Sequence, residues 1–370
     1  MSLSGDGTAG KAGVGVKTAR LQTEGVRGTT GIAQAVALLR AGGTVAFPTE
    51  TVYGLGANAL DPVAVAKIFA AKERPGWDPL IVHVEGREML ERVAVMPAGS
   101  QGRMVAKLMT AFWPGPLTLL LPRTAKVPDA VTAGRPLVGV RMPANPIARQ
   151  LIRQTGVPLA APSANRFGGT SPTTAAHVLA DLDGRIDAVL DGGPATVGVE
   201  STVVGPDPEN EERMLIYRPG GVTLERLEAV VGAGCFALYR PPAGGEAPES
   251  QPSPGSGLRH YSPKARLMLV RGIAGASGPV ETSLVEAIDT AIAPGGEVGV
   301  MLPDGWDKGA AQIVFRWGPW TDAEILARLL YFGLRSLDER GAKVIVCPVP
   351  EMGGLGEALR DRLEKAARQQ

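Results

Sequence analysis

The chain has 370 residues, of which 44% are hydrophobic and 20% charged, so it is long and apolar enough for two folded domains of roughly 150 residues each. The net charge of +1 argues against a protein-wide basic surface for nucleic acid, and two cysteines with three separated histidines argue against a disulfide framework or a protein-held metal. No apolar run approaches the ~20 residues of a membrane helix, and the first residues carry no apolar signal segment, so we expect a cytoplasmic protein without a membrane partner.

The first 239 residues predict short helices and strands that do not alternate strictly. Residues 1–24 are expected to form a flexible arm, and a helix over 32–39 precedes a buried strand at 44–47. Asp61-Pro62, an N-cap followed by proline, begins the next helix. Further strands are predicted at 79–84, 117–121, 137–141, 157–160, 188–190, 201–204 and 214–217, and helices at 101–112, 145–155, 173–181 and 223–231, with Thr173 as a cap. This order predicts an α/β fold with a mixed sheet over 25–239.

The last third of the chain has a different pattern. Residues 240–264 are rich in proline, glycine and serine, which is typical of a linker. Strands predicted at 267–270, 298–301, 312–315 and 343–347 alternate with helical patterns. One of these helices begins at Thr321-x-x-Glu324, which reads as a capping box. The alternation predicts a small parallel α/β domain over 265–370.

Three polar segments of the first domain could bind a ligand. Residues 48–56 follow a buried strand and are rich in hydroxyls and glycines, which suits either a ligand loop or an ordinary tight turn. Lys72 and Arg74 precede a Pro/Gly loop, where they could bind phosphate or simply stabilise a helix end. His83 ends a short strand and is either a core or a site residue. Arg141 also ends a strand and is either a carboxylate clamp or an edge residue.

Later segments add to this pattern. Small and hydroxyl residues over 161–173 would let a ligand approach the backbone closely, and polar residues recur at 200–204 and 218–221. The chain contains no P-loop motif, and glycines 272, 275 and 278 have the wrong spacing for a dinucleotide site, so we expect only a turn there. A nucleophile elbow is also missing, which argues against a triad hydrolase.

These segments together resemble one family. The motifs occur in the order P-T-E-T-V-Y-G-L-G at 48–56, K-x-R at 72–74, P-L-I-V-H at 79–83, V-R-M-P at 140–143, P-S-A-N at 162–165, S-P-T at 171–173, E-S-T-V-V at 200–204 and R-P-G at 218–220. Over about 28–232 the chain is similar to the YrdC-like family of threonylcarbamoyl-AMP synthases. The segments R-H-Y-S-P at 259–263 and G-L-G-E-A-L-R-D-R-L at 354–363 resemble its long, two-domain form.

The resemblance implies an open, twisted mixed sheet with a concave positive face, followed by a smaller Rossmann-like C-terminal domain. It implies that L-threonine, bicarbonate and ATP give threonylcarbamoyl-AMP and pyrophosphate, and that a separate transferase moves the product group to tRNA. Magnesium would accompany the triphosphate, held mostly by phosphate oxygens and water. No protein nucleophile is needed, so catalysis would rest on placement and on neutralising charge.

The family motifs also assign roles residue by residue. Lys72 and Arg74 resemble the catalytic phosphate clamp. The positions that resemble contacts to threonine and the carboxylated intermediate are Thr51, His83, Arg141, Ala161, Ser163 and Ser201, and those that resemble ATP contacts are Lys72, Arg74, Asp78, Leu137, Asn165, Ser171, Arg218 and Tyr261. Asp78 stands where the family often has asparagine and would repel phosphate unless it meets magnesium or Arg74. Leu137 stands where a small hydroxyl residue is usual. Tyr261 would belong to a lid if the linker at 240–264 folds over the cleft.

Two other functions stay open. A carbamoyl-transfer protein of the hydrogenase-maturation type embeds a similar domain, but such proteins add zinc-finger modules, and this chain has no C-x-x-C. A non-catalytic module for structured RNA could instead use Lys72, Arg74, Arg141 and Arg218 against a phosphate backbone, and weak RNA binding could also accompany catalysis.

Overall fold

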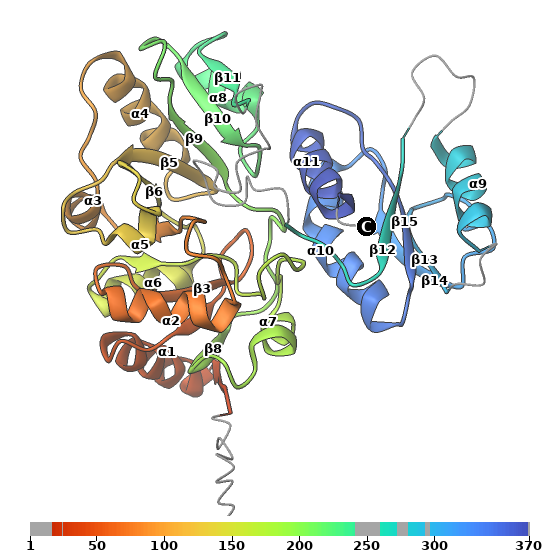
Figure 1. Ribbon diagram of the computed structural model, residues 1–370, viewed down its shortest axis with the longest axis horizontal. Helices are drawn as coiled ribbons and strands as arrows, with labels where there is room; N and C mark the ends of the chain where they lie inside the picture. Colours follow the sequence, from red (N-terminus) through yellow and green to blue (C-terminus); the bar gives the residue numbers. More distant parts are fainter. Residues whose placement is uncertain (1–16, 24, 241–259, 272–279, 293–296, 369–370) are drawn as a thin grey trace, which may run out of the picture.

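The structure is a computed structural model and describes residues 17–23, 25–240, 260–271, 280–292 and 297–368, with side chains from residue 30 onward in the first helix. The polypeptide forms two units, the larger from the N-terminal part and the smaller from the C-terminal part (Figure 1). The glycines at 272, 275 and 278 and residues 241–259 of the predicted lid lie outside the described residues.

The larger unit contains a sheet of eleven strands that bears helices. The strands are β1 (Ala19–Gln22), β2 (Val45–Phe47), β3 (Gly54–Asn58), β4 (Ile81–His83), β5 (Leu117–Pro122), β6 (Leu137–Arg141), β7 (Leu159–Ala160), β8 (Ala188–Asp191), β9 (Thr202–Pro206), β10 (Met214–Arg218) and β11 (Phe236–Leu238). The helices are α1 (Gly25–Arg40), α2 (Pro62–Lys72), α3 (Arg87–Val93), α4 (Gly99–Phe112), α5 (Asp129–Thr132), α6 (Pro146–Thr155), α7 (Ala175–Leu182) and α8 (Leu224–Val231).

The strands of this sheet run in the order β1-β8-β2-β3-β7-β4-β6-β5-β9-β10-β11. Parallel pairs such as β4 with β6 and β5 with β9 stand beside antiparallel pairs such as β5 with β6, which confirms the predicted mixed sheet. In the β4–β6 pair, His83 lies opposite Arg141 at the carboxyl ends of both strands. The topology therefore brings these two side chains, far apart in sequence, to one edge of the sheet.

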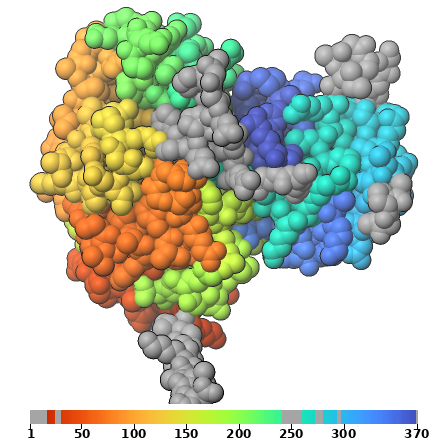
Figure 2. Space-filling model, viewed as in Figure 1, coloured from red at the N-terminus to blue at the C-terminus, as the bar shows by residue number. Residues whose placement is uncertain are grey.

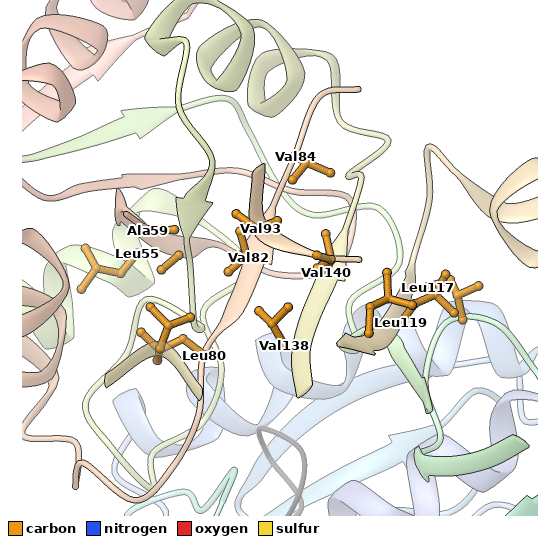
Figure 3. Close-up of a cluster of buried hydrophobic side chains, with 14 of the residues drawn as sticks. Leu55, Ala59, Leu80, Val82, Val84, Val93, Leu117, Leu119, Val138 and Val140 are labelled. Atoms are coloured by element: carbon orange, nitrogen blue, oxygen red, sulfur yellow. The ribbon is translucent and has the colours of Figure 1, made fainter. Parts of the chain in front are cut away.

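Apolar side chains of the strands and helices form the cores that hold this edge in place. One cluster joins strand residues such as Leu55, Val82 and Val140 with residues of α2 and α4, and part of it is drawn in Figure 3. A second cluster joins α1 and α6 to β2 and β8. Two helices, α2 and α6, begin where the sequence predicts: the Asp61 side chain accepts from Val63 N, and Asn145 accepts from Ile147 N.

The smaller unit confirms the predicted parallel α/β architecture. It comprises β12 (Arg266–Val270), α9 (Val280–Ile292), β13 (Val298–Pro303), β14 (Ile313–Gly318), α10 (Ala323–Glu339), β15 (Val344–Pro348) and α11 (Leu355–Ala367). Its four strands run in the order β12-β15-β13-β14 and pair in parallel. None of the helices in the described ranges has the length and apolar character needed to cross a membrane.

Several local predictions are corrected by the structure. Residues 19–22, expected in a flexible arm, form β1, because their backbone pairs in parallel with β8. Part of the glycine-rich segment 48–56 is not a loop but the start of β3, which pairs with β2. The caps of two helices lie one residue later than predicted. Asp322 rather than Thr321 accepts from the amides that begin α10, and Thr174 rather than Thr173 caps α7.

The two units are packed against each other, and Figure 2 shows them side by side. Gly198, in the loop before β9, has a φ of +81°, and a Cβ placed there would lie 2.4 Å from the Arg328 Cα of α10. Nearby Gly193 has a similar φ of +78°, but a Cβ there would meet nothing within 4 Å. The two glycines therefore separate backbone strain from contact between the units.

We expect Gly198→Ala to destabilise the protein more than Gly193→Ala. Both variants carry a left-handed alanine, which costs about 1–2 kcal/mol, but only Gly198→Ala also forces the units apart, at about 1–3 kcal/mol more. Urea denaturation of the two variants measures the difference in unfolding free energy. Equal losses would contradict a tight contact between Gly198 and α10.

Candidate active site

A cavity lies where the carboxyl ends of β4 and β6 meet the loops around them. Its lining comes from β3, β4, β6, β10 and the connecting loops, and from residues 260–261 just before the smaller unit. The lining residues are Thr49, Thr51, Val52, Gly54, Arg74, Ile81, His83, Arg141, Ala161, Pro162, Ser163, Glu200, Ser201, Arg218, His260 and Tyr261. The cavity is thus formed by hydroxyls, three arginines and small residues.

Arg141 lines the cavity and is held in one orientation by three contacts. Its Nη1 donates to Thr51 Oγ1 at 2.9 Å, its Nε donates to the Gly115 carbonyl at 3.1 Å, and its Nη2 pairs with Glu50 Oε1. Burial acts to raise the pKa of Glu50, but the charge of Arg141 and its contact outweigh burial, so the pKa lies below its ordinary value. Glu50 therefore stays ionised and fixes the guanidinium for a carboxylate ligand.

His83 lies beside Arg141 and is uncharged. Its ring meets Phe47 edge-on with centroids 6.2 Å apart, and its Nδ1 has no hydrogen-bond partner among the described residues. Burial, with a smaller effect from Arg141, lowers the pKa of His83 from 6.5 to about 3. A neutral imidazole with a vacant nitrogen at the cavity wall can hydrogen-bond a ligand without adding charge.

Arg74 and Lys72, the two residues of the predicted phosphate clamp, lie in different environments. Arg74 lines the cavity and pairs with Asp78 Oδ2 at 2.9 Å, and its Nη2 also donates to the Pro79 carbonyl at 2.7 Å. Lys72 does not line the cavity, because its Nζ donates to the Ser163 carbonyl at 2.6 Å and to the Asn165 carbonyl. Burial and the nearby Arg74 lower the pKa of Lys72 well below its usual range. In this structure Lys72 shapes the 163–165 loop.

Asp78 would repel a phosphate if its charge were uncompensated, and in the structure it pairs with Arg74. Burial raises the pKa of this carboxyl, while Arg74 acts in the opposite direction. Its Oδ2 also lies 3.6 Å from His260 Nε2, and burial together with Arg74 lowers the pKa of that histidine well below 6.5. Asp78 thus meets an arginine and a neutral imidazole, so its charge is compensated within the protein.

Arg218 and Ser201 also line the cavity and are joined by hydrogen bonds. The guanidinium donates from Nε and Nη2 to the Ser201 carbonyl at 3.1 and 3.0 Å, and from Nη2 to Ser201 Oγ at 3.1 Å. Ser201 Oγ in turn lies 2.7 Å from Thr118 Oγ1. Tyr261, from the end of the linker, lines the same cavity with its hydroxyl buried and without a hydrogen-bond partner among the described residues.

Most of the predicted site residues meet in this cavity. Those that line it are Thr51, Arg74, His83, Arg141, Ala161, Ser163, Ser201, Arg218 and Tyr261. Those that do not are Lys72, Asp78, Leu137, Asn165 and Ser171. Leu137 is half-buried at the start of β6, and Asn165 donates to two carbonyls of its own loop, which orders that loop. Ser171 Oγ donates to Glu200 Oε1 at 2.7 Å.

Sequence reasoning missed three polar lining residues, Thr49, Glu200 and His260. All three stand inside motifs that the sequence analysis used, P-T-E-T-V-Y-G-L-G, E-S-T-V-V and R-H-Y-S-P, so the signal was present without an assigned role. Across the described ranges, no group of three or more histidines, cysteines or acidic residues is arranged to hold a metal ion. The roles of the individual site residues stay predictions.

A mixed α/β sheet with an arginine-lined cavity at its strand ends defines a protein that binds a small anionic ligand. A family model described as "Telomere recombination" (Sua5, YciO and YrdC) matches residues 37–220, and one described as "Threonylcarbamoyl-AMP synthase, C-terminal domain" matches 222–368. The chain belongs to this Sua5/YrdC family of threonylcarbamoyl-AMP synthases, as the sequence resemblance indicated.

Relatives along nearly the whole chain agree with this assignment. The chain is 42% identical to the threonylcarbamoyl-AMP synthase of Pyrococcus abyssi over 333 residues, which cover 90% of this chain and 93% of that protein. It is also 42% identical to the Bacillus subtilis enzyme of the same name, over 91% of this chain and 92% of that protein. The crystal structure of P. abyssi Sua5 complexed with L-threonine superposes with a TM-score of 0.83 at 40% identity and covers 95% of this chain and 97% of that one.

The neutral state of His83 predicts an acid sensitivity. The pKa of His83 is about 3 in the folded protein and 6.5 as the ordinary value. Between pH 6.5 and pH 3 the unfolded chain therefore binds a proton on this histidine that the folded protein does not bind. Stability is therefore fully present above about pH 6.5 and falls as the pH drops toward 3, by about 2 kcal/mol between pH 7 and pH 5.

Urea unfolding of the wild type and of His83→Gln at pH 7 and pH 5 checks this expectation. The variant should lose about 2 kcal/mol less than the wild type over the interval, because glutamine does not titrate. Equal losses in the two proteins would show that His83 does not carry the acid sensitivity.

Proposed function

We propose that this chain condenses L-threonine, bicarbonate and ATP into threonylcarbamoyl-AMP, pyrophosphate and water. The observation that carries the proposal is a cavity lined by three arginines, Arg74, Arg141 and Arg218. Such a site suits one ligand with a carboxylate and a second with phosphates. The 42% identity to synthases of that name over nine-tenths of the chain supports the same reaction.

The reaction needs two bond-forming steps. Bicarbonate takes up a proton and loses water to give CO2. The threonine nitrogen then attacks the carbon of CO2, a C–O π bond opens to give a carboxylate, and the nitrogen releases a proton, which leaves N-carboxythreonine. A carboxylate oxygen of that carbamate then attacks the α-phosphorus of ATP, and the bond to the β-phosphate oxygen breaks, with its electron pair going to pyrophosphate. Neither step requires a protein nucleophile, so the enzyme contributes position and charge.

Arg141 would hold the threonine carboxylate. Its guanidinium is already oriented by Glu50, Thr51 and the Gly115 carbonyl, so binding would require little further ordering. Neutral His83 beside it offers a nitrogen to the polar groups of the bound amino acid or its carbamate. The small residues Ala161 and Ser163 line the same cavity and leave room in it for a ligand.

Arg74 and Arg218 would face the phosphates. Magnesium, if carried in with the triphosphate, would neutralise part of its charge. The one carboxylate in the described cavity lining is Glu200, and its oxygens already accept from Tyr331 and Arg362. These residues fit an ion held by phosphate oxygens and water rather than by a protein cage. Lys72 would act through the loop carbonyls that it holds.

An RNA-binding module without catalysis is less well supported. The arginines that such a module would use are only 8% (Arg74), 4% (Arg141) and 4% (Arg218) exposed, so a phosphate backbone could not reach them. A hydrogenase-maturation role is also disfavoured, since the family assignment extends through the C-terminal unit. The downstream tRNA transferase, weak RNA binding and a cytoplasmic location remain predictions.

Pyrophosphate release measured with the full chain tests the proposed reaction. We expect release that requires ATP, threonine and bicarbonate together, with threonylcarbamoyl-AMP as the product detected by mass spectrometry. Release independent of threonine would contradict the proposal. Salt-dependent RNA binding without any turnover would favour the binding module instead.

Arg141→Gln should raise the KM for threonine by about 10- to 100-fold, since a charge-assisted hydrogen bond contributes about 1.5–3 kcal/mol. The matched control is Arg149→Gln. Arg149 belongs to α6, pairs with Glu85 and lies outside the cavity. Steady-state kinetics of both variants measure the effect. A KM for threonine equal to that of the control would remove Arg141 from the carboxylate contact.

A further inference from the structure

A buried charge at the boundary of the two units connects the cavity to the C-terminal part of the chain. Glu200 lines the cavity, and Arg362 of α11 donates from Nε to its Oε2 at 2.7 Å. The Tyr331 hydroxyl of α10 lies 2.8 Å from the same oxygen and 3.0 Å from Oε1, which also accepts from Ser171. Burial acts to raise the pKa of Glu200, but Arg362 outweighs it and the pKa is lowered. The carboxylate is therefore ionised and fully occupied.

The same two residues of the smaller unit hold the ring of Tyr261. The Tyr331 ring stacks on it with centroids 5.7 Å apart and planes 25° apart. The Arg362 guanidinium lies over its face, 5.1 Å from the centroid. The Tyr261 hydroxyl, by contrast, makes no hydrogen bond with the described residues, although it is buried in the cavity wall. The ring is thus fixed from one side and has its polar end available for a ligand.

The backbone at Tyr261 alone does not account for this orientation. Its φ is +72°, an unfavourable region for a residue with a side chain, so other contacts must hold it there. Ser262 N donates to the Gly168 carbonyl at 2.9 Å, which anchors the backbone next to Tyr261 but not its ring. Arg362 itself is oriented by a second bond, from Nη2 to the Pro219 carbonyl at 2.9 Å, next to Arg218 of the cavity.

We infer that Arg362 and Tyr331 of the C-terminal unit are positioning residues that orient Tyr261 and Glu200 in the wall of the active-site cavity. The smaller unit therefore completes the site in cis instead of serving only as an attached domain. This inference rests on the proposed function, and it assigns a role to two residues that do not line the cavity themselves. Arginine is required because its planar fork meets the carboxylate, the carbonyl and the aromatic face at once.

Kinetics of Arg362→Lys and Tyr331→Phe in the full chain test the inference. Lysine keeps the charge but loses the fork, and phenylalanine keeps the ring stack but loses the hydroxyl. We expect Arg362→Lys to raise the KM for ATP about 10-fold, and Tyr331→Phe to raise it less. The control is Glu364→Gln, which removes the exposed ion pair of α11 with Arg271 and should behave as the wild type.

A double-mutant cycle separates positioning from stability. If Arg362 acts through Tyr261, then Arg362→Lys should change the KM for ATP much less in a Tyr261→Ala background than in the wild type. Additive effects on KM would overturn the inference. So would wild-type kinetics for both Arg362→Lys and Tyr331→Phe.

Hydrogen–deuterium exchange supplies a readout that does not depend on turnover. Arg362→Lys should speed exchange in residues 260–264 while the Glu364→Gln control does not, and unchanged exchange in Arg362→Lys would count against positioning. A wild type without threonine-dependent pyrophosphate release would refute the proposed function, but the exchange measurement would still decide whether Arg362 orders this segment.

Discussion

Burying positive charge is the constraint on which the rest of this site depends. A cavity that binds phosphate and carboxylate needs arginines, yet a guanidinium removed from water is costly unless its donors are satisfied. Around the cavity Arg141 meets Glu50, Arg74 meets Asp78, and Arg362 meets Glu200. Each pair fixes a guanidinium in one orientation before a ligand arrives, and this is the state that electrostatic catalysis requires.

The sheet topology brings these pairs together. Parallel pairing of β4 with β6 sets His83 opposite Arg141, while β9 begins at Thr202, directly after Glu200 and Ser201. Loop residues such as Thr49, Pro162 and Glu200 join the strand ends in lining the cavity. A site that limits access of water would protect both a carbamate, which a proton drives to lose CO2, and a phosphoanhydride, which water hydrolyses.

The smaller unit takes part in the same arrangement. Its helices α10 and α11 contact the larger unit at Glu200, at Pro219 and, through Arg335, at Asp181. Gly198 has no side chain where the loop before β9 passes α10, so the two units can approach closely. In this chain the two units therefore share a tightly packed boundary, at which Glu200 and Tyr261 of the cavity lining meet residues of α10 and α11.

The sequence by itself determined the elements and motifs whose causes are local. The caps at Asp61 and Asn145 and the strand at Ile81–His83 follow from neighbouring residues and from periodicity. The site residues came from the family resemblance of the motifs, and nine of them line one cavity. Only the tertiary structure decided which groups the buried charged side chains contact. It set Lys72 against carbonyls of the 163–165 loop, Asp78 against Arg74, and Glu200 against Arg362, which is 162 positions away. Partners at that separation are selected by strand order and domain packing, which no local spacing encodes.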